Sequence, residues 1–263
     1  MSLERLKEFT KPYLELLPRV EMQRHGDAVM EGLLTEMERK SVEPIAEQVG
    51  QHRRTLQYFM GESPWDHQAL VNQLCETVAK DIGDANGILV IDPSAFPKKG
   101  KKSVGVARQW CGRLGKKENC QVGVFLGYVT NKGHTLVDER LYLPREWTKD
   151  RRRKEICHVP ASVRFKTAQK LALEMLENRR RELPHSWIVG DDEFGRGFPF
   201  RKELERMGEI LRNPNVDIRS LARKITHRLR RNEQSRIDHW KKFNRLPPPW
   251  TIVRSNFVPN FAQ

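Results

Sequence analysis

The chain has 263 residues, of which 38% are hydrophobic, and its 48 basic residues exceed 34 acidic ones for a formal net charge of +14. This length is enough for one large domain or two small ones, and the composition excludes a chain that is disordered throughout. A membrane-spanning protein is also excluded, because no apolar run approaches the roughly 20 residues that cross a bilayer. The basic residues occur in clusters, which favours a nucleic-acid partner over a merely basic soluble enzyme.

Residues 3–80 are predicted to be helical. In the first helix, Leu6, Phe9 and Tyr13 recur at steps of three and four residues and make one apolar face. The same stretch mixes charges into its apolar positions, so it does not resemble a signal peptide. The four cysteines are scattered without a CxxC pair, which indicates reduced thiols in a cytoplasmic protein.

A helix-turn-helix pattern lies within the segment 41–62. Ser41 is the expected N-cap of a short helix, Gly50 breaks that helix, and a second helix begins with polar and basic residues that include Arg53 and Arg54. In DNA-binding proteins the second helix of this motif carries the base contacts. A helical hairpin with a plain packing role would give the same pattern, so both interpretations stay open.

An α/β arrangement begins after a turn-like stretch at 80–87. The pattern predicts strands at 87–92, 119–129 and 134–143, a hairpin turn at Asn131 and Gly133, and a helix at 162–182. A fourth strand follows within "SWIVGDDEFG" and a helix at about 198–207. This order predicts an α/β sandwich with a mixed sheet flanked by helices. The segment from Arg219 onward is strongly basic and weakly patterned.

Two of the predicted strands run directly into an acid, the first at Asp92 and the fourth at Asp191. If these strands are neighbours, the two carboxylates come together and repel each other unless a cation lies between them. Carboxylate oxygens select Mg²⁺ or Mn²⁺, and two such ions can support phosphoryl transfer. Acids at strand ends also serve as helix caps or solvated loop residues, which is the alternative.

A cluster of lysines follows the first acid. We expect this cluster and an arginine downstream to hold a phosphate backbone as positioning contacts. The residues are Lys98, Lys99, Lys101, Lys102 and Arg108.

Several long segments go beyond a general pattern. They read "VIDPSAFPKKGKKSVGVARQWCGRLGKKENCQVGVFL", "RLYLPREW", "VPASVRFKTAQKLALEML" and "WIVGDDEFG". Segment by segment, they resemble the bacterial insertion-sequence transposases of the DDE superfamily, within the IS-seven-hundred-one-like group. "SVEPIAEQV" and "SPWD" near the N-terminus match the same group, so the resemblance extends from about residue 5 to about residue 254.

The resemblance implies an RNase H-like catalytic core that uses Mg²⁺ or Mn²⁺, with two ions in a complete enzyme, to cut DNA at element ends and join it to target DNA. Asp92 falls on the family's first catalytic acid and Asp191 on the second, and both would be metal ligands. Pro93 and Ser94 stand where the family usually has Asp and Thr. No glutamate lies in a context that matches the third acid, so the chain is expected to be a transposase truncated within its insertion domain.

Three domains are therefore expected. Residues 1–82 would form a helical, DNA-binding domain, residues 83–212 an incomplete RNase H-like core, and residues 213–263 a basic segment that begins the insertion domain. The expected partners are DNA, at element ends and target, and a second copy of the chain, in the nucleoid-associated cytoplasm of a bacterium. One alternative is a non-enzymatic DNA-binding fragment that regulates transposition, and another is a decayed product whose core folds incompletely.

Overall fold

The structure is a computed structural model that describes residues 3–190, 194 and 198–209. Two compact units divide the chain: the first ends at Glu76 and the second begins at Thr77. The predicted basic segment at 213–263 lies outside the described residues. None of the helices within the described part is long and apolar enough to cross a membrane.

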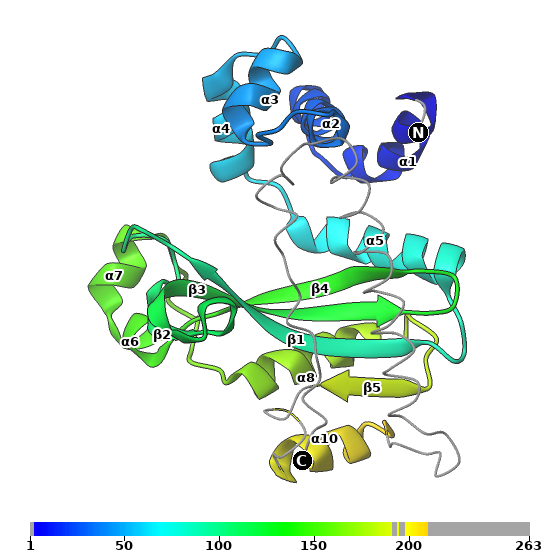
Figure 1. Ribbon diagram of the computed structural model, residues 1–263, viewed down its shortest axis with the longest axis vertical. Helices are drawn as coiled ribbons and strands as arrows, with labels where there is room; N and C mark the ends of the chain where they lie inside the picture. The colour runs from blue at the N-terminus through cyan, green and yellow to red at the C-terminus, as the bar shows by residue number, and fades with distance from the viewer. Residues whose placement is uncertain (1–2, 191–193, 195–197, 210–263) are drawn as a thin grey trace. The chain divides into compact units, whose positions relative to one another are not determined.

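The first unit is all-helical, as the sequence predicts. Its helices are α1 (Leu3–Leu14), α2 (Val20–Leu34), α3 (Val42–Gln48), α4 (Arg53–Gly61) and the beginning of α5 (His67–Ile82), which continues into the second unit (Figure 1). Two apolar clusters hold α2, α3 and α4 together. In one of them Phe59 packs against Leu17, Met22 and Trp65, and in the other Leu56 packs against Ile45. Ser41 occupies the N-cap position of α3, but its side chain makes no capping hydrogen bond.

The turn between α3 and α4 depends on Gly50, whose φ of +66° lies in the left-handed region. A Cβ added there would meet no atom within 4 Å, so Gly50→Ala introduces backbone strain without a clash. We expect this substitution to lower the free energy of unfolding by about 1 kcal/mol. Gly61→Ala is the matched control, because it also meets no atom but has no positive φ, and it should be neutral or slightly stabilising. Thermal melts compare the two variants, and equal melting temperatures would contradict the prediction.

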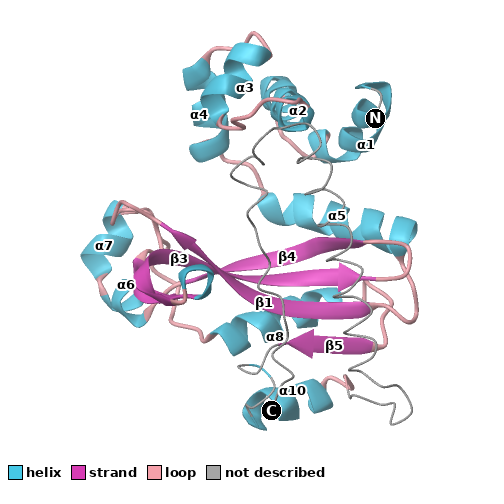
Figure 2. Cartoon of the chain, viewed as in Figure 1, coloured by secondary structure: helices cyan, strands magenta, loops and turns pink. Residues whose placement is uncertain are grey.

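The second unit is built around a five-stranded mixed sheet (Figure 2). Its strands are β1 (Ile88–Pro97), β2 (Ala107–Cys111), β3 (Lys116–Val129), β4 (His134–Tyr142) and β5 (Trp187–Gly190). β3 pairs antiparallel with β1, β2 and β4, whereas β5 pairs parallel with β1. Thr130 and Gly133 close the β3–β4 hairpin with a backbone hydrogen bond of 2.8 Å, which confirms the predicted turn.

Helices and a short 3₁₀ turn complete this unit: η1 (Gly112–Leu114), α6 (Arg145–Lys149), α7 (Arg151–Ile156), α8 (Ala168–Arg179) and α10 (Phe198–Arg206). α8 packs against β3 and β4, and α10 packs against α8. The side chains of Leu89, Ile91, Val124 and Leu126 are fully buried in the sheet. The predicted fold class is confirmed: a mixed sheet flanked by helices, of the RNase H-like type, with helices before it.

Tyr128 fixes the amino end of β1. Its hydroxyl accepts a hydrogen bond of 3.0 Å from the Asp84 N–H and donates one of 2.5 Å to the Pro184 carbonyl. Burial raises the pKa of this phenol, so the hydroxyl keeps the proton that it donates. The turns that precede β1 and β5 are thereby joined at one point, which aligns the beginnings of the two parallel strands.

All four cysteines are free thiols. Cys75, Cys111 and Cys120 are buried, and Cys157 is partly buried. Burial, followed by the neighbouring Cys111, raises the pKa of Cys120. The scattered spacing in the sequence thus corresponds to thiols that form no disulfide, and Cys111 and Cys120 lie in the core of the second unit.

Candidate functional site

The two strands that carry the predicted acids are neighbours. β1 and β5 run parallel, and their last aligned pair is Ile91 with Gly190. Asp92 follows Ile91 directly and is partly buried, while Asp191 follows Gly190 in the sequence. The condition for the two carboxylates to come together, that their strands are neighbours, is therefore met.

Asp191 itself lies outside the described residues, so only its flanks can be placed. A Cβ on Gly190 would lie 3.0 Å from the Cβ of Phe194, which is tight enough to favour glycine at the end of β5. Phe194 is 1% exposed, and its ring meets that of Phe200 on α10 at 5.5 Å, edge to face. The described residues on either side of Asp191 are thus packed, Gly190 in the sheet and Phe194 in an aromatic pair.

A second acid, Glu139, lies directly across two strands from Asp92, and the sequence pattern does not indicate it. Asp92 pairs with Phe125 on β3, and Phe125 pairs with the exposed Glu139 on β4. Residues directly opposite in antiparallel strands point to the same face, and two strand spacings separate the outer pair by about 10 Å. Among the described residues no group of three His, Cys, Asp or Glu side chains is close enough to hold a metal ion.

The lysine cluster lies farther from Asp92 than the sequence predicts. β1 does not end at residue 92 but continues to Pro97, paired throughout with β3. Six residues of extended chain place Lys98 about 20 Å beyond Asp92. The predicted end of this strand was wrong, because Pro93 suggests that the strand stops there. Beyond Ile91, however, β1 has no β5 residue beside it, so it is an edge strand at this point and tolerates a proline. The lysines therefore do not lie beside Asp92.

The loop that carries the lysines is nevertheless held in place. The Asn119 side chain donates to the carbonyls of Lys98 and Gly100 at 2.5 and 3.0 Å. On the other side, Arg153 of α7 donates to the Lys101 carbonyl at 2.9 Å. All four ammonium groups belong to exposed residues. The backbone of the loop is fixed while its cationic side chains face solvent.

A buried tryptophan supports the same loop. Trp147 of α6 is 0% exposed, and its indole N–H donates to the Val106 carbonyl at 2.8 Å. The guanidinium of Arg153 lies 3.6 Å from the centroid of the Trp147 ring. Neither α6 nor α7 was predicted, because segments of five and six residues carry too little periodicity to detect.

The predicted DNA-contacting arginines are exposed. Arg108 lies on β2, where it pairs with Asn119, and this places it next to the lysine loop. Arg53 and Arg54 begin α4, and Arg53 forms an ion pair with Glu43 of α3. A surface ion pair contributes little, so this arginine can exchange the carboxylate for a phosphate at small loss.

Glu118 lies on β3 next to Asn119, beside this basic surface. A backbone hydrogen bond from Asn119, followed by the ammonium of Lys116 at 3.3 Å, lowers the pKa of its carboxyl. It therefore stays ionised at neutral pH, and it offsets part of the positive charge of the loop.

Comparison with known proteins gives two findings. A family model described as DDE superfamily endonuclease matches residues 12–250. The chain is also similar to a protein of Microchaete diplosiphon described as a probable transposase for insertion sequence element IS701, with 32% identity over 141 residues. That match covers 53% of this chain and 37% of the relative, so the chain spans little more than a third of the relative's length.

Proposed function

Because the chain belongs to the family of DDE superfamily endonucleases, we propose that it is a DNA transposase that cuts and joins DNA at the ends of an insertion sequence. The proposal rests on the parallel pairing of β1 with β5. Asp92 directly follows the last residue of β1 that pairs with β5, and Asp191 directly follows the last residue of β5. The relative's printed description supports the same activity.

Endonucleases of this superfamily generally use divalent metal ions. In this chain Asp92 and Asp191 would hold the ion, and their hard carboxylate oxygens suit Mg²⁺ or Mn²⁺, with two ions in a complete site. The partly buried position of Asp92, on a strand paired on both sides up to Ile91, fits a ligand that must be rigid. When bound, such ions activate the attacking oxygen and stabilise the leaving oxygen in phosphoryl transfer.

The chain's own residues would bind and orient the DNA. The lysine loop and Arg108 would contact the backbone about 20 Å from Asp92, which corresponds to about six base pairs of duplex at about 3.4 Å each. Arg53 and Arg54 would contact DNA from the helical first unit, as the helix-turn-helix interpretation predicts. The proposal includes a homodimer in the nucleoid-associated cytoplasm of a bacterium.

The test of this proposal is strand cleavage by the purified chain on a duplex that carries the ends of its element, with Mg²⁺ or with EDTA. Cleavage that requires the cation supports the transposase. Salt-sensitive binding without cleavage supports the alternative of a regulatory DNA-binding fragment. A broad, non-cooperative melt would instead indicate a core that folds incompletely.

Removing two loop lysines should weaken DNA binding. We expect Lys98→Ala with Lys99→Ala to lower the affinity for duplex DNA and to reduce the slope of log K against log salt by about 0.9 for each phosphate that the loop no longer neutralises. The matched control is Lys80→Ala with Lys202→Ala, which removes the same charge from exposed positions outside the loop. A salt titration measures both, and equal slopes for the two double variants would argue against DNA binding by the loop.

A further inference from the structure

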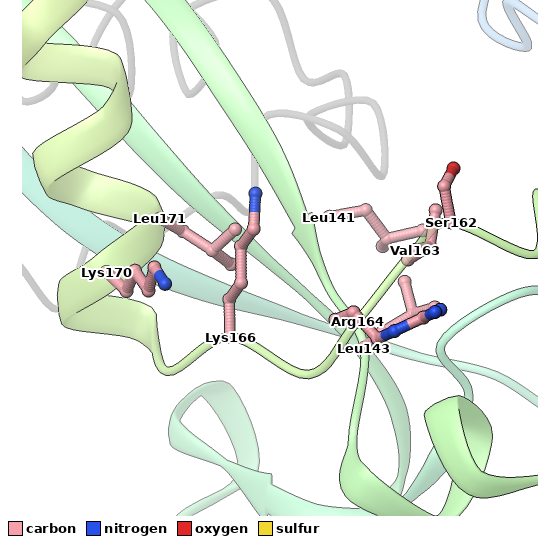
Figure 3. Close-up of a pocket in the computed structure, with 8 residues that line it drawn as sticks. All are labelled: Leu141, Leu143, Ser162, Val163, Arg164, Lys166, Lys170 and Leu171. Carbon is pink, nitrogen blue, oxygen red and sulfur yellow. The ribbon is translucent and has the colours of Figure 1, made fainter.

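A pocket of about 500 Å³ opens between the end of β4, the segment 162–166 and the first turn of α8 (Figure 3). Its volume lies within the range of small-ligand sites. Four aliphatic side chains line it: Leu141, Leu143, Val163 and Leu171. Three basic side chains stand among them, and in Figure 3 the ammonium of Lys166 extends between Leu171 and Leu141.

The cations of the pocket exceed its acids. Lys166 pairs with Glu174 at 2.7 Å, and the Arg164 guanidinium donates to the Ala161 carbonyl. Lys170 is exposed, and no carboxylate of the described residues pairs with its ammonium. Two positive charges therefore remain over apolar walls, an environment that suits a ligand with one apolar part and one anionic part.

The sheet register places one wall of this pocket, Leu141, on the same face of the sheet as Asp92 and two strands away from it. Leu141 pairs with Gly123, and Gly123 pairs with Ser94, two residues beyond Asp92. Two strand spacings separate Leu141 from Ser94 by about 10 Å between Cα atoms. Asp92 lies two residues, or about 7 Å, along β1 from Ser94, so Leu141 is about 12 Å from Asp92. At about 3.4 Å of rise per nucleotide, this is about three to four nucleotide steps along one DNA strand.

We propose that this pocket holds one unpaired nucleotide of the DNA strand that passes Asp92. The faces of the base would lie against the aliphatic side chains. Its two flanking phosphates would lie one on Arg164 and one on Lys170, which stand at opposite ends of the pocket in Figure 3. Phosphate alone would gain nothing from the apolar walls, and a base within a duplex is covered by its stacked neighbours. The inference rests on the proposed function, because only a chain that acts on DNA presents such a nucleotide to this surface.

Two variants test the pocket by different routes. Ser162→Trp fills it from an exposed rim position without changing charge, and Lys170→Glu reverses the charge of the ammonium that pairs with no described carboxylate. The probes are a single strand of roughly ten deoxythymidines with one 2-aminopurine, and a blunt duplex of the same length. We expect each variant to bind the single strand about five- to tenfold more weakly, with 2-aminopurine fluorescence as the readout. Ser162→Trp should bind the duplex as the parent does.

Lys80→Glu is the matched control, because it makes the same charge change at an exposed position outside the pocket. It should change single-strand affinity by less than Lys170→Glu does. The inference would be overturned if both pocket variants bound the single strand as tightly as the parent, or if they lost single-strand and duplex binding equally. In either case, duplex binding by the parent would still support the proposed function. If the parent binds neither probe, the proposed function and this inference fail together.

Discussion

Asp92→Asn is expected to slow cation-dependent DNA cleavage strongly while leaving the fold intact. The substitution keeps the size and the strand position of the side chain, which pairs with Phe125 beside the end of β5. It removes the charge with which Asp92 would hold a divalent cation, and such a cation would contribute several kcal/mol to the stabilisation of the transition state. Loss of several kcal/mol lowers the cleavage rate by about 10²- to 10³-fold, measured on an end-bearing duplex with Mg²⁺ or Mn²⁺.

A second readout separates the loss of a ligand from a loss of stability. Mn²⁺ should raise the melting temperature of the parent, because an ion that binds only the folded state stabilises it. The rise should vanish in Asp92→Asn and persist in Asp81→Asn, which removes the same charge from an exposed position on α5. Undiminished cleavage by Asp92→Asn would exclude this residue as a metal ligand.

The sequence predicts the sheet well where the pattern is local. Apolar runs in β1, β3, β4 and β5, together with the Asn131–Gly133 turn, identify four of the five strands. The missed strand, β2, alternates buried and exposed residues over only five positions and contains Arg108 and Gln109. A pattern this short and polar is indistinguishable from a loop until β3 pairs with it.

The start of α8 shows what local pattern cannot predict. The sequence predicts a helix from residue 162, but the helix begins at Ala168, where the Thr167 hydroxyl accepts a hydrogen bond from the Lys170 N–H. The carbonyls of Ala161 and Val163 instead accept from the buried ammonium of Lys154 at 3.2 and 2.8 Å. A buried lysine on another helix thus takes acceptors that a longer α8 would use, and no local pattern contains that contact. The same unwound segment lines the pocket.

The candidate site, like the sheet, could be predicted from the sequence only in part. The sequence shows that the strands before Asp92 and Asp191 are both apolar runs that end in an acid, but it leaves open whether these strands are neighbours, which the pairing of β1 with β5 answers. The sequence pattern misplaces the lysine loop, because only the 14-residue length of β3 reveals that β1 continues past Asp92. The sequence pattern also misses Glu139, which lies opposite Asp92 only because β1, β3 and β4 pair side by side.

Asp138→Ala should strongly destabilise the second unit, because it leaves the buried guanidinium of Arg179 with only the partly exposed Glu182 as a carboxylate partner. Asp138 on β4 and Arg179 on α8 are 0% and 1% exposed in their side chains, and Oδ2 lies 2.9 Å from Nε. Removing one partner of a buried pair costs about 3–5 kcal/mol. For a chain of this size, that is a fall of roughly 6–20 °C in melting temperature.

Two comparisons show whether the buried charge causes the loss. Glu182 also binds Arg179, at 2.8 Å, but its side chain is 43% exposed, so Glu182→Gln should cost less than about 1 kcal/mol. Combining Asp138→Leu with Arg179→Leu removes both charges and keeps apolar volume, so it should destabilise less than the sum of the two single changes. Additive losses would mean that α8 is held to β4 by packing alone, and the Asp138–Arg179 pair would then have no coupling energy of its own.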